Sequence, residues 1–194
     1  MANIYLHPLD ERMTRQGYAM VRYADDFVIL CQTAEEARAA LEEIKTWVEA
    51  NGLTLHPDKT HVGDCRMDGQ GFDFLGYRFE AGKRWVRKKS LMAVKDKIRS
   101  LTRRTRGDSL VRIIADLNPR LIGWFGYFKH ADPLEFKRMD GFIRRRLRAL
   151  LRKQDKRPGI GRCQADHRRW PNIFFATHGL FTMSEAWAFA SQSL

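Results

Sequence analysis

The sequence predicts an α+β protein in which a small part containing β-hairpins and a covering helix precedes an all-α basic part. Short apolar, β-branched runs flank an Asp-Asp pair near the N-terminus, which is typical of a hairpin. Apolar residues then recur at helical spacing over most of residues 90–153. The charge also changes sign near Gly82: residues 1–82 carry 8 Lys and Arg against 14 Asp and Glu, whereas residues 83–194 carry 27 against 9.

This charge distribution indicates a nucleic-acid binder, because a net charge of +18 over 112 residues is too lopsided for a merely solubilising surface. The cysteines, Cys31, Cys65 and Cys163, form no Cys-x-x-Cys pair, so neither structural zinc nor disulfides are expected. No apolar run reaches the roughly 20 residues of a membrane span, and the first 22 residues mix charges throughout. We expect a cytoplasmic protein without a membrane partner.

The hairpin is predicted from Ala19–Val21 and Phe27–Leu30, with Asp25 and Asp26 at its turn. Two unpaired carboxylates are too costly to bury, so either the turn is solvated or a cation lies on it. Hard oxygen ligands on a rigid turn suit Mg²⁺, which binds through one or two carboxylates together with substrate phosphates.

Helix and strand signals continue along the N-terminal part. Residues 1–16 predict a short helix or loop that Pro8 interrupts. Thr33-Ala-Glu-Glu36 is a capping box that begins a helix covering one face of the hairpin sheet, and Asn51-Gly52 ends it. Residues 53–55 predict a short strand. Residues 72–79 predict one strand covered on both faces, in which Gly76 would permit close backbone approach.

The basic part predicts four helices before an apolar tail. A helix begins at Ser90 and Gly107 closes it, Ser109 caps the next, and Pro119 begins a third that runs to about Lys129. Trp124 and Tyr127 on this third helix are expected either in the core or stacked on bases.

Pro133 begins the longest helix, to about Lys153. Eight cations within residues 137–153 repel one another unless an anion lies beside them, which favours a phosphate backbone. Residues 158–161 predict a flexible loop. Residues 170–194 predict a loop and short helix that pack back on the helices.

Four motifs together carry a resemblance to a known family. The hairpin box Tyr23-Ala-Asp-Asp26 resembles the metal-binding box of reverse transcriptases. Leu55–Thr60 resembles the lysine-bearing motif that follows it, Phe72–Phe79 the primer-grip hairpin, and Leu117–Phe128 the maturase-specific thumb region. Their order and spacing are similar to those of bacterial group II intron-encoded reverse transcriptase/maturases.

The resemblance implies an RNA-directed DNA polymerase with Mg²⁺ on Asp25 and Asp26, and with Lys59 assisting at the pyrophosphate leaving group. It implies a partial palm over 1–82, a helical maturase domain over 83–169 and a packed tail over 170–194. The expected partners are group II intron RNA, an RNA template and a DNA primer. The primer grip is expected at Phe74, Leu75 and Gly76, and RNA contacts at Lys88, Lys89, Arg103, Arg104, Arg144, Arg145, Arg146, Arg148, Arg152 and Lys153.

A family palm takes a further aspartate from an upstream strand, and the context of Asp10 does not resemble that strand. We therefore expect the chain to represent the C-terminal portion of such a protein, with little polymerase activity by itself. The hairpin would expose an apolar edge, so self-association or pairing with a complementary N-terminal palm and fingers segment is expected.

Two functions stay open from the sequence. One is the polymerase, which needs the missing carboxylate. The alternative is a non-catalytic maturase fragment that binds intron RNA and stabilises it for splicing, which needs no catalytic residue in the protein. A generic basic helical DNA binder is a third reading, but it leaves the palm motifs unexplained.

Overall fold

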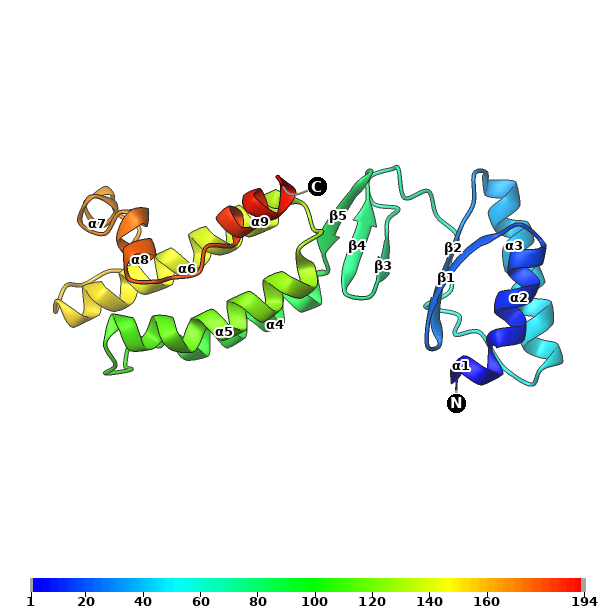
Figure 1. Ribbon diagram of the computed structural model, residues 1–194, viewed down its shortest axis with the longest axis horizontal. Helices are drawn as coiled ribbons and strands as arrows, with labels where there is room; N and C mark the ends of the chain where they lie inside the picture. The colour runs from blue at the N-terminus through cyan, green and yellow to red at the C-terminus, as the bar shows by residue number, and fades with distance from the viewer. Residues whose placement is uncertain (1, 193–194) are drawn as a thin grey trace. The chain divides into compact units, whose positions relative to one another are not determined.

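The computed structural model describes residues 2–192, and the chain divides into two compact units, Met1–Gly82 and Lys83–Leu194 (Figure 1). The first unit mixes short helices with hairpin strands, and the second is mainly helical. This confirms the predicted α+β class. Within the described residues, no helix is both long and apolar enough to cross a membrane.

The first unit is built on a two-stranded hairpin that two helices cover on one face. Its elements are α1 (Ala2–Tyr5), α2 (His7–Arg15), β1 (Ala19–Tyr23), β2 (Asp26–Leu30) and α3 (Ala34–Ala50). Strands β1 and β2 pair antiparallel, with Tyr23 opposite Asp26. Helices α2 and α3 lie against this hairpin (Figure 1), and the core between them contains Leu9, Met13, Ile44 and Trp47, packed on Met20, Phe27 and Ile29 of the strands.

Local capping explains where the helices of this unit begin. The Thr33 hydroxyl accepts a hydrogen bond from the Glu36 N–H at 3.1 Å, and the Glu36 carboxylate accepts one from the Gln32 N–H at 2.7 Å. The predicted covering helix is therefore confirmed. A break falls beside Pro8, because α1 ends at Tyr5 and α2 begins at His7. Pro8 lies in the first turn of α2, where its missing N–H costs nothing.

Residues 72–80 form a hairpin, as the family resemblance implied, whereas the alternation pattern alone predicted a single strand. Strands β3 (Phe72–Phe74) and β4 (Tyr77–Glu80) pair antiparallel around a turn in which Leu75 and Gly76 both have positive φ, 48° and 81°. Two-residue hairpin turns with two positive φ values usually have the sequence Asn-Gly, so Leu75-Gly76 did not indicate a turn. A close backbone approach is present at Gly71, where a Cβ would lie 2.3 Å from the Phe79 carbonyl oxygen. The strand predicted at residues 53–55 is also absent: these residues are irregular.

The second unit opens with β5 (Lys83–Val86) and continues as helices. These are α4 (Lys88–Leu101), α5 (Leu110–Phe128), α6 (Pro133–Gln154), α7 (Gln164–Arg169), α8 (Asn172–Thr177) and α9 (Met183–Ser191). Helix α4 thus begins two residues before the predicted Ser90 and ends well before Gly107. The fully buried side chains of this unit include Ile98, Ile113, Leu117, Phe136, Ile143, Leu147 and Phe175.

Helix α5 runs through Pro119 without a break, which corrects the prediction of a separate helix from that residue. Leu117 and Leu121, on either side of the proline, are fully buried, so tertiary packing holds the helix together. The Asn118 side chain also donates to the Gly179 carbonyl at 2.7 Å and accepts from the Phe181 N–H at 2.9 Å.

The starts of α5 and α6 follow the predicted signals. Ser109 caps α5 by accepting from the Arg112 N–H at 3.3 Å, and Asp132 caps α6 by accepting from the Leu134 N–H at 2.9 Å, with Pro133 in the first turn. The predicted apolar tail contains two helices, α8 and α9, and not one. Helix α9 packs on α6 and α5, and Figure 1 shows it beside α6.

Candidate metal-binding turn and nucleic-acid interface

The hairpin turn of the first unit presents Asp25 and Asp26 to solvent. Ala24 has a positive φ of 57°, Asp25 follows it at the tip and Asp26 begins β2. Both aspartates are exposed. The Arg22 side chain stabilises the turn, because its Nη1 donates to the Ala24 carbonyl oxygen at 2.6 Å.

Arg22 is itself fixed by Asp10 of α2. Its Nε donates to Asp10 Oδ1 at 2.7 Å and its Nη2 donates to Oδ2. This hydrogen-bonded pair lowers the pKa of the Asp10 carboxyl and raises that of the Arg22 guanidinium. Asp10 is therefore engaged in a structural ion pair and is not free to join Asp25 and Asp26 as a metal ligand.

Two adjacent carboxylates on a rigid turn fit part of a Mg²⁺ coordination shell. Within residues 2–192, no group of three His, Cys, Asp or Glu side chains is placed to hold a metal ion. The turn supplies oxygen ligands of the right kind, and substrate phosphates, waters and a further carboxylate would have to complete the shell.

Lys59 and the expected primer grip lie elsewhere in the first unit. Lys59 is exposed in an irregular segment, and its backbone N–H bonds the His56 carbonyl at 3.1 Å. Across the described part of the chain, no hydrogen bond or ion pair joins Lys59 to either turn aspartate. Phe74 ends β3, and Leu75 and Gly76 form the β3–β4 turn, with the Leu75 side chain partly exposed.

Three of the arginines predicted to contact RNA have hydrogen-bond partners within the protein. Arg148 is 2% exposed and donates to the Trp170 carbonyl and to Asn172 Oδ1, both at 2.9 Å. Arg146 donates to Thr102 Oγ1 at 3.0 Å and to the Thr102 carbonyl at 2.7 Å, which covers the C-terminal end of α4. Arg152 donates to Asp166 Oδ1 at 2.6 Å and holds the loop before α7.

The remaining predicted cations are exposed or half-buried. Lys88 and Lys89 are exposed in the first turn of α4, Arg103 is exposed just beyond its end, and Lys153 is exposed near the end of α6. Arg104, Arg144 and Arg145 are half-buried.

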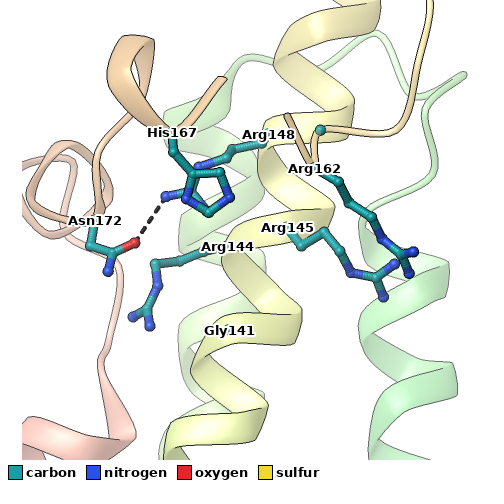
Figure 2. Close-up of a pocket in the computed structure, with 8 residues that line it drawn as sticks. Gly141, Arg144, Arg145, Arg148, Arg162, His167 and Asn172 are labelled. Atoms are coloured by element: carbon teal, nitrogen blue, oxygen red, sulfur yellow. Dashed lines mark hydrogen bonds between the residues drawn. The ribbon is translucent and has the colours of Figure 1, made fainter. Parts of the chain in front are cut away.

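Arg144 and Arg145 also line a pocket that sequence reasoning did not find (Figure 2). The chain after α6 returns to this helix and adds Arg162 and His167 to its wall. Arg162 comes from a segment that reads as a simple basic loop, so no local signal indicated that it faces α6. Burial lowers the pKa of the Arg145 guanidinium, and the neighbouring charges of Arg162 and Arg99 lower it further. Positive charge is therefore crowded here.

Comparison with known families agrees with this architecture. A model of the reverse transcriptase (RNA-dependent DNA polymerase) family matches residues 1–79, and a model of the group II intron maturase-specific domain matches residues 91–170. No curated protein matches the chain. The fold and the two matches define a reverse-transcriptase domain joined to a maturase domain. The chain belongs to the group II intron reverse transcriptase/maturases, which confirms the family that the four motifs indicated.

Proposed function

We propose that this chain binds folded group II intron RNA through the basic surface of its second unit and acts as a maturase. The observation that carries the proposal is the separation of the cations into two classes. Arg146, Arg148 and Arg152 are bonded within the protein, whereas another set of exposed or half-buried cations has no carboxylate partner within residues 2–192. That set is Lys88, Lys89, Arg103, Arg144, Arg145 and Lys153.

The RNA phosphate backbone is the partner whose charge matches this surface. Release of the counterions condensed on RNA favours the contact, and an A-form helix is recognised mainly through its shape and phosphates. The maturase role needs no catalytic side chain in the protein, because the intron RNA performs the splicing chemistry. The helical second unit would stabilise the RNA fold that is competent for splicing.

Polymerase function is the second candidate, and the geometry of the hairpin turn favours it. Arg22 and Asp10 hold Asp25 and Asp26 exposed at one point, as a metal site beside a primer terminus requires. Asp25 and Asp26 would bind Mg²⁺, and Lys59 would assist at the leaving group during synthesis from a DNA primer on an RNA template. A further carboxylate would be needed, supplied by another polypeptide segment or a second copy of the chain.

The RNA-binding proposal is tested with a charge-matched pair of variants. Lys88→Gln, Lys89→Gln and Arg103→Gln together remove three exposed charges from the second unit. The control removes Arg15, Arg38 and Arg66, three exposed charges of the first unit, by the same substitutions. In a filter-binding assay with group II intron RNA, we expect the first variant to bind about tenfold or more weakly and the control about as tightly as the unmodified chain. Equal losses in the two variants would contradict the proposal.

A further inference from the structure

The pocket beside α6 gathers arginines without matching carboxylates (Figure 2). Arg144, Arg145, Arg148 and Arg162 line a space of about 400 Å³. Within residues 2–192, the guanidinium groups of Arg144, Arg145 and Arg162 have no acidic partner. Figure 2 shows Arg145 and Arg162 extending side by side from α6 and from the returning segment. Like charges held this close repel one another unless an anion lies between or beside them.

Arg148 adds a buried charge at the wall of this pocket. Its hydrogen-bond acceptors, the Trp170 carbonyl and Asn172 Oδ1, are both neutral. Burial lowers the pKa of its guanidinium, and the charge of Arg144 lowers it further. The negative charge of Asp166 raises the pKa of Arg148, but Arg152 already donates a hydrogen bond to this carboxylate. A buried cation with neutral partners is stabilised when an anion enters the adjoining space.

Gly161 allows the returning segment to complete the pocket. It is buried, has a positive φ of 74°, and a Cβ on it would lie 2.6 Å from the Ala149 backbone nitrogen and 2.9 Å from the Arg148 carbonyl carbon. Only glycine tolerates both the conformation and the contact. This close approach brings Arg162 beside Arg145, so the segment predicted as a flexible loop is packed against α6.

Gly141 leaves the mouth of the pocket open. It lies on α6 one turn before Arg144 and Arg145, and a Cβ there would meet no atom within 4 Å. Glycine inside a helix costs about 1 kcal/mol relative to alanine. Here it keeps free the space in front of the arginines.

We propose that this pocket binds one phosphate group of the RNA backbone, held by the guanidinium groups of Arg145 and Arg162. The Arg144 side chain extends to the other side of α6 in Figure 2 and adds positive charge to the wall. The inference rests on the proposed RNA-binding function and deepens it by assigning one phosphate contact to a built site. Arginine suits this task because its planar donors engage phosphate oxygens in pairs. Arg148 adds positive charge at the wall of the pocket and remains hydrogen-bonded to Trp170 and Asn172.

Inorganic phosphate tests the site independently of RNA. Arginine Nε–H signals are followed by NMR during titration with phosphate, and with chloride at the same ionic strength. We expect the Arg145 and Arg162 signals to shift along one saturating curve with phosphate, and the exposed Arg168 signal to stay unchanged. Gly141→Met, which fills the pocket without changing charge, should abolish the response. Equal shifts at Arg168, or the same response to chloride, would show a diffuse cationic surface and overturn the proposal.

Intron RNA then tests whether the phosphate belongs to RNA. Gly141→Met should weaken RNA binding several-fold and make the slope of log affinity against log salt shallower by about 1, as expected for one lost phosphate contact. The control is Gly123→Met, at an exposed glycine of α5 where a Cβ also meets nothing within 4 Å. It should leave both quantities unchanged.

Equal effects of the two methionine variants on RNA binding would overturn the assignment to this pocket. If the unmodified chain failed to bind intron RNA while phosphate still saturated the pocket, the proposed function would fail. The site would then stand as a phosphate site with another ligand, and the RNA part of this proposal would be wrong.

Discussion

Asp10 and Arg22 form a two-bond ion pair that ties helix α2 to the hairpin carrying Asp25 and Asp26. The Arg22 side chain is only 10% exposed, and its Nη1 donates to the Ala24 carbonyl oxygen at 2.6 Å and to Asn3 Oδ1 at 3.1 Å. One guanidinium group therefore joins the helix, the strand and the turn. Asp10 therefore supports the backbone of the turn through Arg22 and is not available as a further metal ligand.

Replacing Asp10 by Asn should destabilise the first unit by about 1–2 kcal/mol near pH 7, because Arg22 loses a charged acceptor in a partly buried place. The folded-state pKa of Asp10 is lowered below its ordinary 3.8, so this stabilisation is present above that pH and disappears as pH falls through the lower folded value. Urea unfolding at pH 7 and at pH 2–3 measures both effects. Glu11→Gln, which breaks an exposed pair with Arg15, is the control and should change stability by less than about 0.5 kcal/mol. A loss at pH 7 that persisted unchanged at the lower pH would contradict this account.

Replacing Asp140 by Ala should release α9 from the second unit. Its buried carboxylate accepts from the Met183 N–H at 3.1 Å, from the Ser184 N–H at 3.0 Å and from the Ser184 hydroxyl at 2.6 Å. It thus caps α9 from a neighbouring helix, and we expect a loss of about 2–3 kcal/mol. Thermal unfolding followed by circular dichroism measures it. Asp96→Ala, at a 67% exposed side chain, is the matched control, and equal losses in the two variants would contradict the assigned role.

Gly161→Ala should lower the free energy of unfolding of the second unit by about 2 kcal/mol or more, because the positive φ and the close backbone contact both exclude a Cβ. Chemical denaturation provides the value. Gly107→Ala, at a glycine without positive φ and with open space around it, should be neutral within about 0.5 kcal/mol. A neutral Gly161→Ala would show that the loop does not pack on α6 in solution.

The outer face of the first hairpin should promote self-association. Val21, Tyr23 and Leu30 are 50%, 66% and 53% exposed, and the strand register places them on the face opposite Met20 and Ile29. An exposed apolar strand pair with open edges favours pairing with another chain. Light scattering after size exclusion should show oligomers at high concentration that Val21→Lys with Leu30→Lys reduces. A clean monomer throughout would contradict this prediction.

Signals confined to a few neighbouring residues allowed several elements to be predicted from the sequence. The capping residues Thr33 and Ser109 and the proline at 133 mark helix starts because their hydrogen bonds or fixed φ act within one turn. The continuation of α5 through Pro119 could not be predicted, because packing and the Asn118 bonds to residues 179 and 181 decide it.

Part of the candidate site could likewise be predicted from local sequence, and part could not. The Asp-Asp turn is visible as a local motif. The distinction between Arg145, which faces the pocket, and Arg148, which is buried, depends on Trp170 and Asn172, more than 20 residues further along the chain. Helical spacing alone places both arginines on nearly the same side of α6, so the sequence grouped them together.

Primer extension on an RNA template with Mg²⁺ should give no synthesis by this chain. Asp25 and Asp26 supply ligands for only part of a two-metal site, and Asp10 is bound to Arg22. Asp25→Asn should therefore behave like the unmodified chain. Synthesis that disappears with Asp25→Asn would contradict the prediction and would mean that a second copy completes the site.

The affinity for folded group II intron RNA as a function of salt concentration tests the central claim most directly. If the cations of the second unit contact the phosphate backbone, log affinity should fall linearly with log salt, with a slope of about −3 or steeper that reflects several phosphate contacts. Absence of binding at low salt, or a slope near zero, would contradict the assignment of RNA binding to this surface.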